Sequence, residues 1–110
     1  MINETLKRIE TTVSDCETLA ATKRYELLTL ISELKQEIGK LEGSDSDAAG
    51  SIARYAESSV SEAVRAQPDT ELLNHSLRGL SLSVQRFEAS HPTLMGIINN
   101  IGQALNSAGI

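Results

Sequence analysis

The chain has 110 residues, which is enough for one domain, and it carries 15 acidic and 10 basic residues for a formal net charge of −5. An acidic chain argues against binding to nucleic acid or to an anionic membrane surface, and no stretch reaches the ~18 apolar residues of a membrane span. A single cysteine, and a first segment without the apolar run of a signal peptide, predict a protein of the reducing cytoplasm.

Aromatic residues make up 3% of the chain, so the core must be built from Leu, Ile, Val and Ala. Aliphatic side chains spaced among Ser, Glu and Lys favour helices that pack side by side. We therefore expect one all-α domain over residues 1–110, an antiparallel helical bundle of four to five helices. Its thin core favours self-association, most simply as a homodimer.

Residues 1–42 carry two apolar seams whose steps alternate between three and four, the stripe of helices that pack in coiled-coil fashion. They form either a coiled-coil-like hairpin, in which Thr22 caps the second helix, or one helix of about 60 Å at ~1.5 Å per residue. The hairpin is favoured because a continuous seam would pass through Lys23 or Arg24. Glu4 and Arg8 have the spacing of an i, i+4 ion pair. The seam residues are Ile2, Leu6, Ile9, Val13, Cys16 and Ala20, then Leu27, Ile31, Leu34, Ile38 and Leu41.

Residues 43–68 begin at Gly43, where the preceding helix is expected to end, and contain the clearest internal boundary, GSDSDAAGS. Ser44 followed by Asp47 has the form of a capping box. The helix expected next offers mainly small apolar side chains and serines, so we expect it to bury little and to be partly mobile. Pro68 ends this segment.

Residues 69–110 are expected to form a pair of helices. Asp69 is placed to cap the first, which should extend to near Ser90, and Pro92 suits the first turn of the second. With Gly109 in a left-handed conformation, Ile110 would fold back on the last turn as in a Schellman motif. The apolar seam of the first helix of this pair comprises Leu73, Leu77, Leu80, Val84 and Phe87.

The last third of the chain contains VQRFEASHPTL, then a helix rich in Ile and Leu, and a closing GI. With this F-E-x-x-H-P-x-L signature, the chain resembles a family of short bacterial proteins of unknown function. The resemblance extends over residues 84–110 and more loosely over residues 2–41, and it implies an N-terminal helical pair. Because that family has no established activity, the resemblance implies an architecture and no function.

Glu88 and His91 have the Glu-x-x-His spacing that di-iron helical bundles use to place two ligands on one helix face. A symmetric dimer would double the motif, so a metal-binding bundle is our alternative function. The apolar seams carry no further glutamate, however, and Pro92 is expected to force His91 off the helix. Cys16 is expected to act as a small hydrophobe. In the absence of a catalytic motif, we expect no enzyme and no cofactor.

The sequence from Ala89 to Ile110 contains no charged residue, whereas a solvent-facing helix flank normally carries charge and interface cores are depleted in it. Either a second copy or a partner covers the last helix, or this helix is the centre of the monomer. We favour the first alternative, which predicts a non-enzymatic interaction or scaffold protein that binds neither nucleic acid nor membrane. A third hypothesis is a small regulator that binds a basic partner through its acidic surface. The predicted interface residues are Leu94, Ile97, Ile98, Ile101, Leu105, Ile110, Gly79 and Phe87.

Overall fold

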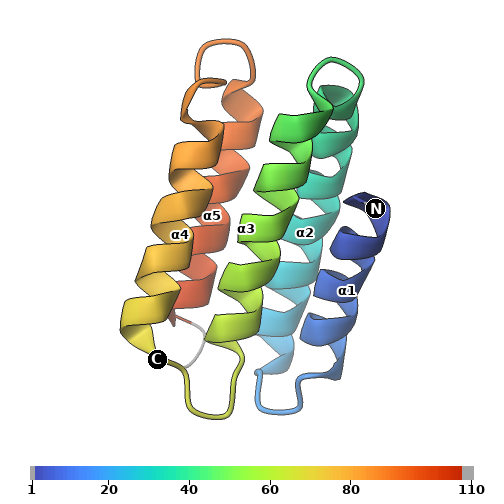
Figure 1. Cartoon of the computed structure of the whole chain (residues 1–110). Helices are drawn as coiled ribbons and strands as arrows, with labels where there is room; N and C mark the ends of the chain where they lie inside the picture. The colour runs from blue at the N-terminus through green and yellow to red at the C-terminus, as the bar shows by residue number, and fades with distance from the viewer. Residues whose placement is uncertain (1, 108–110) are drawn as a thin grey trace.

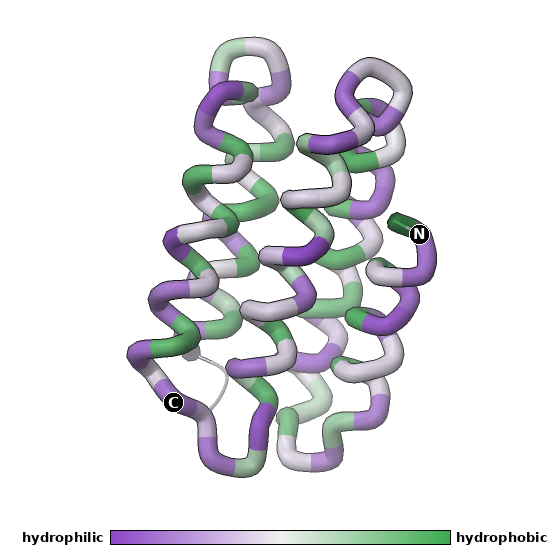
Figure 2. Tube along the Cα trace, in the orientation of Figure 1, coloured by the Kyte–Doolittle hydropathy of each residue, from purple (hydrophilic) through white to green (hydrophobic). Residues whose placement is uncertain are grey.

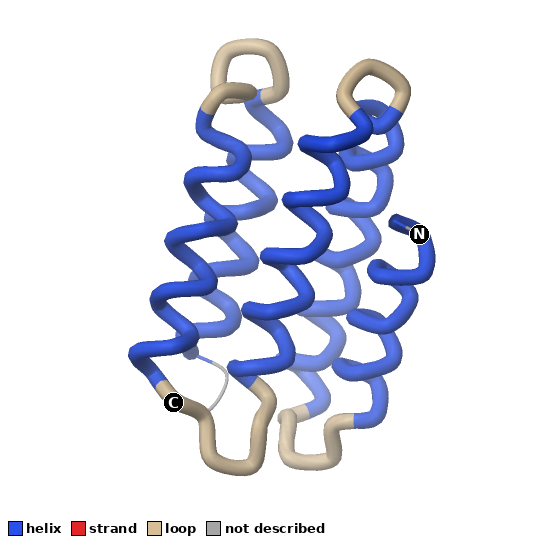
Figure 3. The backbone as a smooth tube through the Cα atoms, in the orientation of Figure 1, coloured by secondary structure: helices blue, strands red, loops and turns tan. Residues whose placement is uncertain are grey.

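The structure, a computed structural model, describes residues 2–107 and contains five helices joined by short loops (Figures 1 and 3). Successive helices run in opposite directions, and the described residues contain no strand (Figure 1). The predicted all-α antiparallel bundle is therefore confirmed. The helices are α1 (Ile2–Asp15), α2 (Ala21–Glu42), α3 (Ser46–Ala63), α4 (Thr70–Gln85) and α5 (Pro92–Ser107).

The five helices form two layers. Helices α4, α3 and α1 lie side by side in one layer, and α5 and α2 form the other (Figure 1). Helix α3 contacts each of the other four helices, whereas within the described part of the chain α1 contacts only α2 and α3. The centre of the bundle is therefore α3, the helix that the sequence suggested would bury little.

Small side chains place α3 at the centre. Because an alanine or serine lets a neighbouring backbone approach closely, a helix with several of them can be packed on more than one side. Ser59 is fully buried, and its hydroxyl donates a 2.8 Å hydrogen bond to the carbonyl oxygen of Tyr55, so its polar atom has a partner in the core. The buried residues of α3 are Ala48, Ala49, Ile52, Ala53, Ala56, Ser59, Val60 and Ala63.

The other helices bury the larger aliphatic side chains. Figure 2 shows hydrophobic positions, in green, recurring along each helix at helical spacing. The seams of α1 and α2 pack into the same core as those of α4 and α5, and they form one continuous cluster. The largest fully buried side chains are Leu6, Ile9, Leu27, Ile31, Leu34, Ile38, Leu41, Ile52, Leu73, Leu80, Leu94 and Ile101.

Residues 2–42 form a hairpin and not one long helix (Figure 1). The predicted cap at Thr22 is wrong, because α2 already begins at Ala21 and its N-cap, Ala20, makes no side-chain hydrogen bond. The turn is instead closed by Arg24, whose guanidinium donates to the carbonyl oxygens of Cys16 and, at 3.2 Å, Leu19. A guanidinium that hydrogen-bonds two carbonyls fixes the direction in which the chain leaves α1.

The predicted ion pair between Glu4 and Arg8 is replaced by a contact between helices. The Arg8 guanidinium lies 2.8 Å from the carboxylate of Glu57 on α3 and joins α1 to the central helix. This hydrogen bond, together with the charge of Glu57, raises the pKa of Arg8 above its ordinary value. An exposed ion pair of this kind contributes little to stability. Its main effect is to favour the packing of α1 against α3.

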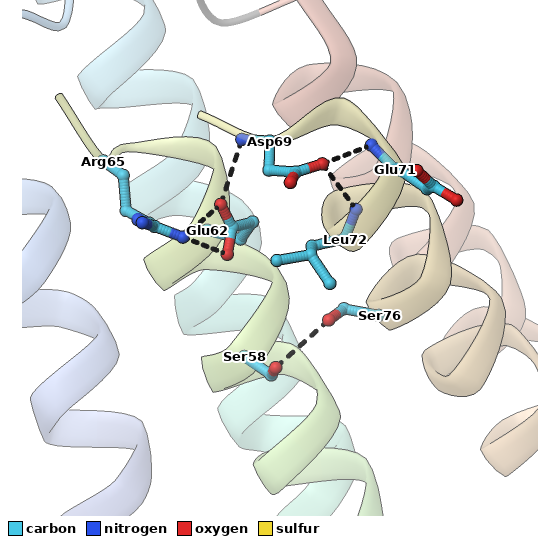
Figure 4. Close-up of polar contacts among 7 residues, drawn as sticks. All are labelled: Ser58, Glu62, Arg65, Asp69, Glu71, Leu72 and Ser76. Carbon is cyan, nitrogen blue, oxygen red and sulfur yellow. Dashed lines mark hydrogen bonds and ion pairs between the residues drawn. The ribbon is translucent and has the colours of Figure 1, made fainter. Parts of the chain in front are cut away.

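The caps of α3 and α4 differ in how well the sequence predicted them. Asp45, and not Ser44, caps α3, and its side chain accepts a 3.0 Å hydrogen bond from the amide of Ala48. Ser44 instead donates to the carbonyl oxygen of Leu41 at the end of α2. The predicted cap at Asp69 is confirmed, since its carboxylate accepts from the amides of Glu71 and Leu72 at 3.0 and 3.1 Å (Figure 4).

The connection between α4 and α5 starts earlier than the sequence suggested. Helix α4 ends at Gln85, and the residues up to Ser90 form turns held by bonds such as Phe87 N–H to Val84 O at 2.9 Å. Pro92 begins α5 as predicted. The expected Schellman motif of Gly109 and Ile110 lies outside the described residues.

Candidate interaction surface on helix α5

The apolar face of α5, which the sequence predicted as an interface, is part of the core of the single chain. Leu94 and Ile101 are each 1% exposed, Leu105 is fully buried, and Ile97 and Ile98 are buried as well. They pack against helices α2, α4 and α3. A second folded copy cannot reach these side chains, so any interface on α5 must use the opposite face.

Gly79 and Phe87 also make contacts within the chain. The ring of Tyr55 on α3 covers Gly79 on α4 so closely that a Cβ atom built on this glycine would lie 2.7 Å from the Cδ1 atom of the ring. Phe87 is half-buried, with its ring edge-on to His91 at a centroid distance of 5.8 Å and the Arg86 guanidinium carbon 4.8 Å from its centroid. Ile110, the remaining predicted interface residue, lies outside the described residues.

Glu88 and His91 do not share a helix face. Both lie in the connection between α4 and α5, with Glu88 exposed and His91 half-buried beside Phe87. Residues 2–107 contain no group of three or more His, Cys, Asp or Glu side chains arranged to hold a metal ion. The Glu-x-x-His spacing therefore lacks the helical geometry from which a di-iron site was inferred.

The exposed face of α5 carries no charge. Asn99, Asn100, Gln103 and Asn106 are exposed, and within the described part of the chain their amides make no hydrogen bond to another side chain or to the backbone. Each amide offers both a donor and an acceptor, which is a self-complementary pair of groups. The exposed residues of α5 are Pro92, Thr93, Gly96, Asn99, Asn100, Gln103, Asn106 and Ser107.

A groove of about 550 Å³ runs along one side of this face, between α2 and α5. At one end the ammonium group of Lys23 lies 3.0 Å from Glu26 and donates a 2.8 Å hydrogen bond to Ser107, which ties α2 to the end of α5. Tyr25 stands at the rim with 75% of its surface exposed. The groove is lined by Lys23, Tyr25, Glu26, Thr29, Leu30, Asn100, Gln103, Ala104 and Ser107.

A second groove, of about 350 Å³, runs along the other side of the face, between α4 and α5. None of its lining residues is charged, and the side chain of Gln103 borders both grooves. The amides of α5 thus form a ridge between two hollows. The second groove is lined by Leu77, Leu80, Ser81, Ile98, Asn99, Gly102, Gln103 and Asn106.

The family of the chain is decided by a match over residues 27–110 to a family model described as a domain of unknown function, DUF4404. The chain belongs to the DUF4404 family. The matched DUF4404 region begins within α2 and includes all of α3, α4 and α5, whereas α1 precedes it. Comparisons with curated proteins and with solved structures found no significant match.

Two features of this DUF4404 protein had weak signals in its sequence. Tyr25 is an aromatic residue on the polar side of α2, and only the position of α5 shows that it borders a groove. Cys16 lies at the end of α1, where the hydroxyl of Thr18 is 3.2 Å from its sulfur and the Arg24 guanidinium is near. The hydrogen bond from Thr18 is the main cause of a Cys16 pKa below the ordinary value for a thiol, and the charge of Arg24 acts in the same direction.

No helix described for this DUF4404 chain combines the length and apolar character that crossing a membrane requires.

Proposed function

We propose that this protein is a non-enzymatic helical interaction protein of the cytoplasm that self-associates through the exposed face of α5 and its two flanking grooves. The observation that supports this most strongly is the uncharged surface of α5 in a chain of net charge −5. The proposal keeps the homodimer expected from the sequence and moves its interface from the apolar face of α5 to the amide ridge.

Electrostatic repulsion favours this face over the others. Two copies with a charge of −5 each repel one another, and like charges placed opposite each other at an interface add several kcal/mol of cost. The exposed faces of α1 and α2 carry many acidic groups, including Glu4, Glu33 and Glu42. On α5, two copies can meet without placing any charge of the helix itself against the partner.

The size of a standard interface explains why the grooves are part of the proposal. Each partner in such an interface buries roughly 800 Å², out of a total accessible surface of 6316 Å² for this chain. A helix of 16 residues is about 24 Å long, and its ridge alone is too narrow to provide this area. Together with the grooves beside α2 and α4, the surface is wide enough to bury this area. The amide ridge of one copy can then fit into a groove of the other copy.

Tyr25 is the expected anchor. Tyrosine is enriched among the residues that contribute most to binding, because it covers a large area and offers a hydroxyl at its tip. At 75% exposed, Tyr25 leaves most of its ring to water in the single chain. Covering this ring with a second copy would be a favourable contribution to association.

The test is sedimentation equilibrium of the full chain over about 1–500 μM, with Asn100→Asp and Gln103→Glu as variants and Asn3→Asp on α1 as the control. Asn100→Asp and Asn3→Asp introduce the same charge by the same change of side chain, and α1 does not contact α5 among the described residues. We expect a wild-type dimer that Asn3→Asp leaves unchanged and that each α5 variant weakens about tenfold, which corresponds to ~1.4 kcal/mol. Circular dichroism of all variants should show the same helix content.

The dependence on salt provides a second measurement. Because the helix at the centre of the proposed contact carries no charge while the two copies repel each other, association should strengthen as ionic strength rises. A wild-type chain that remains a monomer at about 500 μM would refute the proposal. A dimer that responds equally to Asn3→Asp and Asn100→Asp would place the interface elsewhere.

A further inference from the structure

A second exposed surface lies on the opposite layer of the bundle, along α3 and α4. Among the described residues, four large hydrophobic side chains are exposed, and three of them lie here: Tyr55, Leu72 and Leu82 at 44%, 50% and 60%. The fourth, Tyr25, belongs to the α2–α5 groove. This surface is therefore separate from the one proposed for self-association.

Between α3 and α4 is a groove of about 370 Å³ that small residues keep open. Gly79 has no side chain, and the ring of Tyr55 lies directly over it, so the ring forms part of the groove wall. Leu82 borders the groove from α4. The lining residues are Ala48, Ser51, Tyr55, Gly79, Leu82, Ser83 and Arg86.

Leu72 continues this apolar surface toward the other end of α4. Figure 4 shows its side chain directed toward α3, between Glu62 and Ser76. The two helices are joined at this level by a 3.1 Å hydrogen bond between the hydroxyls of Ser58 and Ser76 (Figure 4). From Leu72 to Leu82 the helix rises about 15 Å, which matches almost three turns of a partner helix.

Residues 72–86, which run along this surface, carry only basic charges in an otherwise acidic protein. They include Arg78 and Arg86 and no acidic residue, and Arg86 is the one charged side chain among the described residues that line the groove. Arg78 is exposed and has no ion pair or hydrogen bond among residues 2–107. By helical spacing it lies one turn from Leu82 on the outward face of α4.

Two acidic groups beside this surface, Asp45 and Glu62, are ion-paired. Asp45 lies 2.6 Å from Arg86, whose side chain remains 63% exposed. Glu62 pairs with Arg65 and also accepts a hydrogen bond from the backbone amide of Asp69 (Figure 4). An approaching acidic group would therefore meet Arg78, which has no partner among the described residues, and Arg86, whose charge Asp45 partly compensates.

From this pattern, we infer that the α3–α4 face is a docking surface for an acidic amphipathic helix of a partner protein. The apolar positions of that helix, spaced i, i+3, i+4 and i+7, cover Tyr55, Leu72 and Leu82. Its flanking Glu or Asp residues face Arg78 and Arg86. The charge complementarity selects the partner, and the covered apolar area provides most of the affinity.

The test uses two synthetic helical peptides of 18 residues that share one row of leucines at helical spacing. One has Glu on both flanks of the leucine row and the other has Lys. Binding to the full chain is measured by fluorescence anisotropy, and the bound residues are mapped by amide chemical shifts. We expect the Glu peptide to bind with a Kd of about 10–100 μM, to shift the amides of α3 and α4, and to bind at least tenfold tighter than the Lys peptide.

Matched variants separate this surface from the rest of the chain. Leu82→Ser and Arg78→Glu should each weaken binding of the Glu peptide about fivefold. Lys35→Glu, which reverses an exposed charge on α2, should leave it unchanged. Since Arg78 has no partner to lose among the described residues, its variant should remain folded, and amide spectra of the free variants verify this.

Three results would overturn the inference. The first is equal binding of both peptides, or no binding of the Glu peptide at about 1 mM. The second is loss of self-association in Leu82→Ser, which would mean that a second copy occupies this face. The third is binding of vesicles that contain anionic phospholipid in place of the Glu peptide, with the same dependence on Arg78 and Leu82.

Discussion

The ring of Tyr55 on α3 lies over Gly79 on α4 and occupies the space that a side chain at position 79 would need. This contact brings the central helix and α4 together at the level of the α3–α4 groove. It also explains a glycine inside a helix, a position where glycine costs about 0.5–1 kcal/mol relative to alanine.

Replacing Gly79 by alanine should therefore destabilise the protein. The new methyl group displaces the Tyr55 ring, and this cost outweighs the gain in helix propensity. We expect the free energy of unfolding to fall by about 1 kcal/mol. The loss is no larger because the ring is 44% exposed and can move aside. Urea unfolding measures the change in the free energy of unfolding. The matched control is Gly39→Ala on α2, where no other side chain or helix among the described residues lies within 4 Å of an added Cβ atom, and a gain of about 0.5–1 kcal/mol is expected.

A Tyr55→Ala background isolates the contact. Without the ring, Gly79→Ala should stabilise the protein by as much as Gly39→Ala does. If Gly79→Ala and Gly39→Ala were equally favourable in the wild-type background, the packing of Tyr55 on Gly79 would make no contribution.

Arg24 holds the turn between α1 and α2, and its replacement is the second prediction. Arg24→Ala leaves the carbonyls of Cys16 and Leu19 without this donor, which should cost about 1.5–3 kcal/mol in the free energy of unfolding, as for a hydrogen bond to a charged group. Arg78→Ala, at an exposed arginine without a partner among the described residues, is the control and should stay within about 0.5 kcal/mol of wild type. Equal effects of the two variants would show that the turn does not depend on Arg24.

The sequence predicted this hairpin for a related reason but assigned the turn to the wrong residue. Arg24 interrupts the apolar seam, and this interruption correctly argues against one long helix. Its bonding role could not be foreseen, because the carbonyls that it reaches belong to a turn whose path depends on how α1 packs against α3. Tertiary contacts of this kind decide between local alternatives that propensity leaves nearly equal.

The central position of α3 is the larger departure from the sequence-based expectation. Periodicity weighs large aliphatic residues most, so it predicts that a helix rich in Ala and Ser buries little. In the bundle, the small residues allow neighbouring helices to pack closely on several sides. A count of large apolar side chains identifies a core stripe, but it misses the helix around which the others assemble.

Enlarging a buried alanine of α3 should accordingly be costly. Ala56 is 2% exposed at the centre of the bundle, and Ala56→Leu should destabilise by about 1–3 kcal/mol or more, because the neighbouring helices must move apart. Ser61→Leu, an exposed position on the same helix, is the control and should change stability by no more than about 0.5 kcal/mol. Similar melting temperatures for the two variants would contradict the central role of α3.

The candidate interface shows the same division between what the sequence predicts and what it leaves open. The absence of charge from Ala89 onward was visible in the sequence and remains the basis of the proposal. Which face of α5 is free could not be read from it, because the answer depends on the positions of α2 and α4. The grooves, and the place of Tyr25 at the rim of one of them, exist only once these helices are packed.

The last prediction concerns the thiol of Cys16. The hydroxyl of Thr18, 3.2 Å from the sulfur, can donate to the thiolate, and this hydrogen bond is the main reason why the pKa of Cys16 lies below its ordinary value. The rate of alkylation by iodoacetamide, measured against pH, should give a lower apparent pKa for the folded protein than for the protein unfolded in urea. Thr18→Ala should raise the pKa of the folded state, whereas Thr22→Ala, at an exposed position on α2, should not.

The same shift determines a dependence of stability on pH. Because the thiolate is favoured in the folded state, its contribution to the free energy of unfolding is fully present above the pKa of the unfolded thiol and is lost as the pH falls through the pKa of the folded thiol. Between these two pH values the wild-type protein should gain stability relative to Cys16→Ser as the pH rises. A difference in stability between the two proteins that stays constant across this range would mean that the Thr18 hydrogen bond does not favour the thiolate.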